Sequence, residues 1–268
     1  MNYQFLGNSY SLMNYDITIQ LCNSLSIRLW YVPMYTPPRS RNKDDSNMTN
    51  YRLGSQNTEL FELMKSLYSK GEPLITDISD FMRKDGINEK IITTEDNKKA
   101  GYYRVGNFPY FTQKDRAHYF EGVCNLIEHP GQQIIFLDPD AGLAPINQDV
   151  PMARASSLVL PSEINRILNK VTDDSIIVIR QTMNNHFYKQ EARIKDLQKE
   201  LHCNVILLVD EVIQSGLFII TKTDEVSKVI IDRLQSYLSG YKNLKKSDRI
   251  SLGFSQGDDV VIKANGII

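Results

Sequence analysis

Four runs of almost unbroken apolar residues constrain the fold of this chain most. They are residues 27–34 (IRLWYVPM), 133–137 (QIIFL), 175–180 (SIIVIR) and 204–209 (NVILLV). A strand with one solvated face alternates apolar and polar residues, whereas a continuous apolar run indicates a strand covered on both faces, as in a parallel sheet between helices. We therefore expect these runs to be the central strands of one sheet.

The segments between these runs have the periodicity of amphipathic helices. Apolar residues recur every three or four positions in residues 112–128, 188–201 and 224–241, and this spacing places them on one helical face. Thr112 and Asp115 also predict a capping box at the start of the first segment. Strands that alternate with helices of this length predict an α/β fold, a Rossmann-like, doubly wound and mainly parallel sheet.

Two pairs of apolar runs are too close in the sequence for a helical crossover. Residues 204–209 and 217–222 are joined by a short segment, so we expect one reversed strand, 217–222, near an edge of the sheet. In the tail, 249–254 and 260–265 flank the turn-forming sequence QGDD, which predicts a last hairpin.

The length of 268 residues suits a single domain with elaborations. Residues 36–58 are polar and rich in turn formers, which predicts a mobile loop. Residues 73–111 are expected to be an insertion, with a surface hairpin within 88–105. Residues 242–268 are expected to be a C-terminal extension.

Charge and cysteine content narrow the functional classes. The net charge of −1 provides no global field that would draw the chain to nucleic acid or anionic membranes, although it leaves a local basic patch open. The three cysteines are far apart and form no CxxC pair, which argues against a disulfide framework or a zinc knuckle. No signal peptide or apolar membrane span is recognisable. We therefore expect a cytoplasmic protein without a membrane partner.

The sequence LDPDAGL places two acids directly after the strand 133–137. Ligands of doubly wound sheets bind beyond the carboxyl ends of the strands, and Asp138, Pro139 and Asp140 are predicted to lie at that edge. Pro139 restricts the backbone there, and Gly142 allows a tight turn. The alternative is that the two acids only cap a turn, as Asp often does. We interpret the motif as the catalytic site.

Other polar side chains have weaker signals. Gln181 and His186 follow the strand 175–180, so they are candidates for the same edge of the sheet. The four histidines show no metal-ligand spacing, and we predict no metal site from them.

Residues 6–15 (LGNSYSLMNY), followed by LDPDAGL, resemble class I methyltransferase-like proteins and are similar to the bacterial 23S rRNA adenine-N6 methyltransferase family. Residues 215–238 resemble the closing strand and helix of that family, and the three blocks occur in the same order. The chain is also similar to uncharacterised bacterial and phage proteins with GNSY near the start and a later Asp-Pro-Asp-Asn-Gly motif. That second resemblance implies no function.

The methyltransferase resemblance implies S-adenosylmethionine as the cofactor and a nucleic acid as the substrate. In the family, a Gly-Asn pair opens a helix that lines the cofactor pocket, and an Asp-Pro-Pro-Tyr motif after the fourth strand accepts the hydrogens of the target amine. The residues thereby implied to bind the cofactor are Gly7, Asn8, Ser9, Tyr15, Tyr35 and Thr36. The residues implied to be catalytic are Asp138, Pro139 and Asp140.

The sequence departs from the family at several positions. Asp140 replaces the second proline, and Ala141 replaces the aromatic residue that stacks on the flipped base. Residues 31–38 (YVPMYTPP) replace the glycine loop after the first strand. Asn14 and Tyr15 stand where the first helix of the family has lysine and histidine. The resemblance is therefore stronger for the scaffold than for the catalytic residues.

Three functional hypotheses remain open. The first is an S-adenosylmethionine-dependent methyltransferase that modifies a base amino group. The second is a catalytically inactive, methyltransferase-like protein of a phage or defence system that binds a nucleotide, a protein partner or a second copy of itself. The third is a Mg²⁺-dependent nuclease in which Asp138 and Asp140 bind the ion, with Glu163 or Asp210 as a further ligand.

Overall fold

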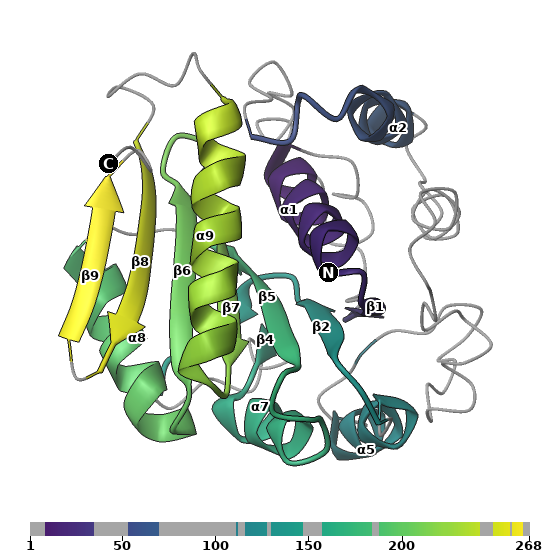
Figure 1. Ribbon diagram of the computed structural model, residues 1–268. Helices are drawn as coiled ribbons and strands as arrows, with labels where there is room; N and C mark the ends of the chain where they lie inside the picture. The colour runs from purple at the N-terminus through teal and green to yellow at the C-terminus, as the bar shows by residue number, and fades with distance from the viewer. Residues whose placement is uncertain are drawn as a thin grey trace.

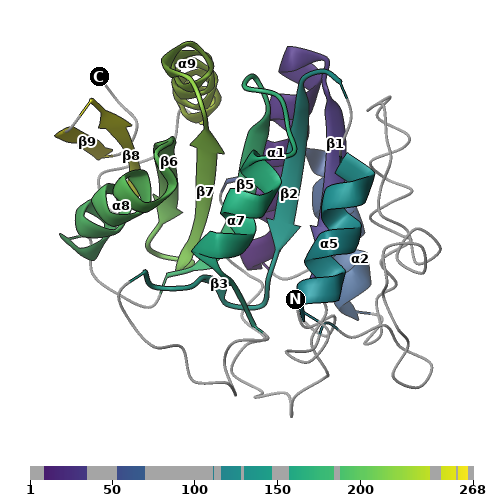
Figure 2. The same ribbon diagram turned by 90° about the horizontal axis from the view of Figure 1, so that it is seen from below.

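Within the part of the chain that the structure describes, seven strands form one mixed sheet that helices cover on both faces in the computed structural model (Figures 1 and 2). The structure describes residues 9–34, 53–69, 111, 116–127, 130–146, 157–183, 188–241, 249–257 and 259–264. Several predictions lie outside these residues: the cofactor candidates Gly7, Asn8, Tyr35 and Thr36, the edge candidate His186, the capping box at Thr112 and Asp115, and the hairpin within 88–105.

The strands of the main sheet follow one another in the order β1-β2-β5-β7-β6-β8-β9. Their bounds are β1 Arg28–Pro33, β2 Gln133–Asp138, β5 Ile176–Thr182, β6 Asn204–Asp210, β7 Ser215–Thr221, β8 Ile250–Gln256 and β9 Asp259–Ala264. The four continuous apolar runs thus form β1, β2, β5 and β6, as predicted. A separate two-stranded sheet pairs β3 (Gly142–Leu143) with β4 (Leu158–Val159) in parallel.

The strand directions partly correct the prediction of one reversed strand near an edge. β1, β2 and β5 are parallel, and β7 is antiparallel to both β5 and β6, which confirms the short hairpin between β6 and β7. However, β7 lies in the interior of the sheet, because it is inserted between β5 and β6. β8 is a second reversed strand, since the C-terminal hairpin of β8 and β9 extends the sheet beyond β6.

The helices divide into two layers, which Figure 2 shows on opposite faces of the sheet. One layer contains α1 (Ser9–Leu25), α2 (Thr58–Ser69) and α9 (Asp224–Gly240). The other contains α5 (Arg116–Ile127), α7 (Pro161–Leu168) and α8 (Tyr188–Leu201). Each layer encloses its own hydrophobic core against the sheet. This is the doubly wound arrangement that the continuous apolar strands predicted, because both faces of β2 and β5 are buried.

Two helices, α1 and α2, were not predicted from periodicity in the sequence. Residues 11–19 of α1 are buried all round, so this helix has no polar face to mark it in the sequence. α2 begins at Thr58, at the end of the segment predicted as a loop, where the Asn57 side chain accepts a hydrogen bond from the Leu60 amide at 3.1 Å. An Asn that caps a helix in this way satisfies one of its free N–H groups.

None of the helices in the described residues is long and apolar enough to cross a membrane.

Candidate functional site

The motif with two acids begins at the carboxyl end of β2, where Asp138 is the last residue of the strand. Alternation along the strand turns the Asp138 side chain to the same face as Phe136, toward α1. Its neighbour Pro33 ends β1 in register with Asp138, and the Met34 amide donates to the Asp138 carbonyl at 3.3 Å. Asp138 itself is buried.

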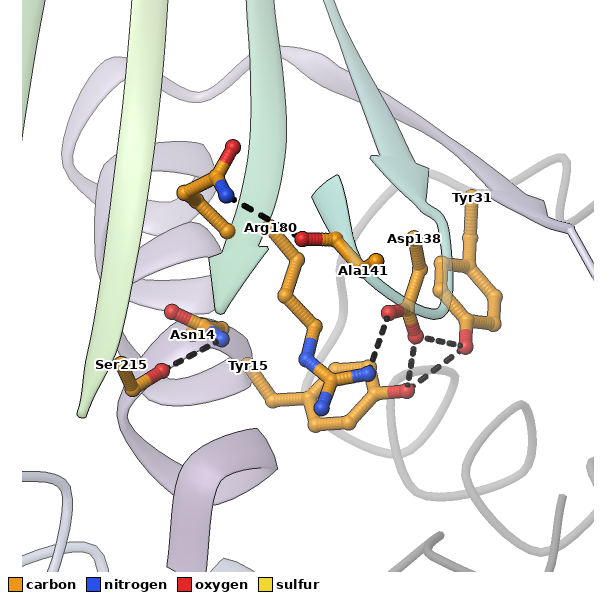
Figure 3. Close-up of polar contacts among 8 residues, drawn as sticks. Asn14, Tyr15, Tyr31, Asp138, Ala141, Arg180 and Ser215 are labelled. Atoms are coloured by element: carbon orange, nitrogen blue, oxygen red, sulfur yellow. Dashed lines mark hydrogen bonds and ion pairs between the residues drawn. The ribbon is translucent and has the colours of Figure 1, made fainter. Parts of the chain in front are cut away.

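Three side chains from three elements surround the Asp138 carboxylate (Figure 3). The hydroxyls of Tyr15 and Tyr31 donate to its Oδ2 at 2.7 and 2.8 Å. Arg180 forms an ion pair with Oδ1 at 3.5 Å. The two hydroxyl oxygens also lie 2.6 Å apart, so one of them can instead donate its single proton to the other. We call Asp138, Tyr15, Tyr31 and Arg180 the Asp138 network.

Strand register explains why these residues meet. Tyr31 of β1 is paired with Phe136 of β2, so its ring lies beside the strand end and 5.5 Å from the Phe136 ring. Arg180 directly follows Ile179, the partner of Leu137, and is therefore level with Asp138 on the next strand. Tyr15 of α1 packs its ring edge-on against Tyr31 and Phe136, with centroid distances of 5.8 and 5.6 Å.

Burial makes the Asp138 network a closed unit. The Asp138 side chain is 1% exposed and the Arg180 side chain 7%. A carboxylate without water must be neutralised and hydrogen bonded, and Arg180 with the two tyrosines supplies both. The carboxylate is thus satisfied within the protein and presents no oxygen to solvent.

The residues after Asp138 form a turn that is fastened to β5. Gly142 has φ +114°, and a Cβ atom there would overlap the side-chain amide of Gln181. That amide accepts from the Leu143 N–H at 2.8 Å and donates to the Ala141 carbonyl at 3.1 Å. The Ala141 carbonyl also accepts from the Thr182 amide at 3.2 Å. Gln181, expected at this edge, therefore lies there and shapes the turn, and Gly142 is required because of this close approach.

The three residues that follow Asp138 differ in burial. Pro139 is buried, whereas Asp140 and Ala141 are half-buried. Asp140 is therefore nearer to solvent than Asp138, and the two acids lie in different surroundings.

The first helix uses its polar residues for internal contacts at this end of the sheet. Asn14 donates from Nδ2 to the Ser215 hydroxyl at 3.3 Å and thereby joins α1 to β7. Tyr15, the next residue, belongs to the Asp138 network and is 1% exposed. Of the cofactor candidates, only Tyr15 and the backbone of Ser9, the first residue of α1, lie within the described residues.

The two further metal-ligand candidates have other partners. Glu163 pairs with Arg116, with Oε2 and Nη2 2.7 Å apart, and accepts from the Leu160 amide at 2.8 Å. Asp210 accepts from the amides of Val212 and Ile213 at 3.0 and 3.4 Å, in the turn between β6 and β7. Within the described residues, no three His, Cys, Asp or Glu side chains are grouped so that they could hold a metal ion.

Arg180 and Tyr31 are the site residues that sequence reasoning missed. Arg180 ends the apolar run SIIVIR. A cation at the end of a buried strand requires a counter-ion, and Asp138 ends another such strand. An arginine and an aspartate at the ends of two buried strands could therefore have predicted the ion pair between Arg180 and Asp138.

No protein-family model matches the chain, and a search of curated proteins finds no significant match.

Proposed function

We propose that this protein is a methyltransferase-like binding protein that takes S-adenosylmethionine or a related adenosine compound and does not use Asp138 to receive a target amine. The observation that carries the proposal is the closure of the Asp138 carboxylate by Tyr15, Tyr31 and Arg180. The ligand would bind beyond the carboxyl ends of β1 and β2, where doubly wound sheets bind their ligands.

The arrangement of the elements supports the methyltransferase-like scaffold. α1, which follows the Gly-Asn pair, packs beside the end of the strand that carries the Asp-Pro motif. The segment that resembles the closing strand and helix of the family forms β7 and α9, and β7 is the reversed strand beside β5. A likeness of scaffold does not by itself imply a shared activity.

The chemistry of amine methylation supports the loss of transfer. An acceptor oxygen must come within about 2.7–3.2 Å of the donor nitrogen of the target, yet Asp138 is buried. Opening the site would separate a buried carboxylate from Arg180, which costs about 3–5 kcal/mol. Ala141 also offers no ring on which a flipped base could stack.

The active methyltransferase is the second candidate, because Asp138 and Pro139 occupy the strand end that the family uses. The nuclease has less support, because Glu163 and Asp210 are engaged with Arg116 and with turn amides. Neither of them contacts Asp138, whose carboxylate bonds only to the other members of the Asp138 network among the described residues.

Titration calorimetry with S-adenosylmethionine, S-adenosylhomocysteine and ATP tests the proposal, together with assays of methyl transfer and Mg²⁺-dependent cleavage on mixed RNA and DNA. We expect binding of at least one adenosine compound and neither reaction. Methyl transfer that is lost in Asp138→Asn and retained in Asp140→Asn would establish the active enzyme and refute the proposal. Absence of binding to all three compounds would refute it as well.

A further inference from the structure

The sheet ends in a strand whose outer edge pairs with no other strand of the described residues. β9 (Asp259–Ala264) pairs with β8 on one side only, and Figure 1 shows it as the outermost strand of the sheet, in yellow. Such an edge presents N–H and C=O groups that can pair with another chain. The sequence of β9 indicates which chain that is.

The charges of β9 are arranged symmetrically about Val261. Asp259 lies two positions before Val261 and Lys263 lies two positions after it. If a second copy of β9 runs antiparallel with Val261 opposite Val261, each Asp259 faces a Lys263 of the other copy. Val260 likewise faces Ile262 of the other copy. A two-fold axis through Val261 therefore creates two opposite-charge pairs and two aliphatic pairs at once.

The backbone pattern of β9 fits the same register. Gln256 and Asp259 are paired across a two-residue connection, and from this closing pair the hydrogen-bonding direction alternates along the strand. The N–H and C=O groups of Val260 and Ile262 then point away from β8. In the symmetric pairing, these are the residues that bond to the other copy. Asp259 and Lys263 then form the intervening pairs, in which side chains approach more closely.

The side chains of β9 are accessible to such a partner. Asp259 is exposed, and the residues from Val260 to Lys263 are half-buried. Val261 packs against the core beneath α1, α2 and α9, whereas Val260 packs against the core beneath α5, α7 and α8. Pairing with a second copy would continue both apolar layers across the edge.

We propose that two copies of this chain form a symmetric dimer by antiparallel pairing of β9, in which Asp259 of each copy faces Lys263 of the other. The contrasting interpretation is that Lys263 protects the edge against association, as edge lysines do in many sheets. The charge arrangement favours the dimer, because a protective lysine needs no aspartate at the position that symmetry places opposite it.

Charge reversal tests the pairing. We expect a wild-type dimer by light scattering coupled to size-exclusion chromatography, and a dimer weakened by about tenfold or more in Asp259→Lys or Lys263→Asp, because each variant places like charges opposite each other twice. An equimolar mixture of these two variants should form a heterodimer, in which every facing pair is again opposite in sign. The double variant Asp259→Lys/Lys263→Asp should dimerise like wild type.

Two interactions within the monomer make the mixture the decisive sample. Lys263 lies 5.7 Å from the Phe254 ring, and the negative charge of Asp259, after the hydrogen bond and charge of Glu191, raises the pKa of Lys195 of α8. Each single variant could therefore lose stability on its own, so thermal unfolding is recorded for both. Recovery of a dimer on mixing cannot arise from such losses.

Hydrogen exchange of the wild-type protein provides a measurement without any variant. We expect the amides of Val260 and Ile262 to become more protected as the protein concentration rises, while the amides of β5 keep the same protection. A wild-type monomer at high concentration, single variants that dimerise as tightly as wild type, or a mixture that stays monomeric would each overturn the proposal.

Discussion

Asp138→Asn is the substitution that most directly tests how much the Asp138 network contributes to the free energy of unfolding. It preserves the shape of the side chain and removes the charge that faces Arg180. Among the described residues no other carboxylate pairs with Arg180, whose side chain is 7% exposed. The variant therefore leaves a nearly buried guanidinium without a counter-ion.

The expected loss of stability follows from these contacts. Removing one partner of a buried ion pair costs about 3–5 kcal/mol. The N–O distance of 3.5 Å is longer than that of a strong charge-assisted bond, which places the ionic part near the lower limit, at about 3 kcal/mol. Weaker hydrogen bonds from Tyr15 and Tyr31 add roughly 1 kcal/mol. A total of about 4 kcal/mol is a large share of the ~5–15 kcal/mol that stabilises a typical domain.

Urea unfolding followed by tryptophan fluorescence measures this loss. The chain has one tryptophan, Trp30, which is 1% exposed in β1 and adjacent in sequence to Tyr31. Asp140→Asn is the matched control, because it makes the same chemical change at a half-buried position of the same motif. We expect it to change the free energy of unfolding by about 0.5 kcal/mol or less.

A double-mutant cycle with Arg180→Met separates the ion pair from general disruption. If the network is a structural unit, the loss in Asp138→Asn/Arg180→Met is smaller than the sum of the single losses by about 2 kcal/mol. A loss below about 1 kcal/mol in Asp138→Asn, or additive losses in the cycle, would refute the interpretation of the network as a structural anchor.

Two further predictions concern other parts of the fold. Gly142→Ala should destabilise the protein by at least about 1 kcal/mol more than Gly131→Ala. Both glycines have positive φ, but only a Cβ atom at Gly142 would overlap Gln181. Equal unfolding midpoints of the two variants in urea would contradict this prediction. Burial raises the pKa of Asp16 above its ordinary value, so the folded state retains a proton that the unfolded chain releases near pH ~4. Stability should therefore fall as the pH rises from there through the folded pKa, and Asp16→Asn should remove this fall; midpoints that depend on pH as strongly as in wild type would show another group to be responsible.

The sequence predicted those elements whose pattern of apolar and polar residues follows directly from the burial of their side chains. Continuous apolar runs predicted β1, β2, β5 and β6, because a strand between two helical layers has no polar face. The helix predicted over 188–201 is α8 with the same bounds, since its charged face is exposed. The shortness of the segment that joins β6 and β7 predicted their antiparallel pairing.

The parts that sequence could not supply depend on contacts between distant segments. The position of β7 between β5 and β6 is a choice among sheet orders that a single hairpin leaves open. Residues 11–19 of helix α1 lack an amphipathic pattern because their surroundings bury this part of the helix on all sides. The Asp138 motif was correctly placed at a strand end, whereas its enclosure by Tyr15 required the packing of a helix 123 residues away in the sequence.

The insertion of β7 between β5 and β6 also dictates an order of assembly. β7 is the neighbour of β5 on the side away from β2, but it follows β6 in the chain. When β5 leaves the ribosome, β7 has therefore not yet been synthesised. β6 cannot occupy that edge without displacing β7 from its final position. We therefore infer that β6 and β7 first form their local hairpin and then dock on β5 as a unit, through β7. A nascent chain that stalls after β6 would leave the apolar edge of β5 open to other chains, so we expect a stall between β6 and β7 to favour aggregation.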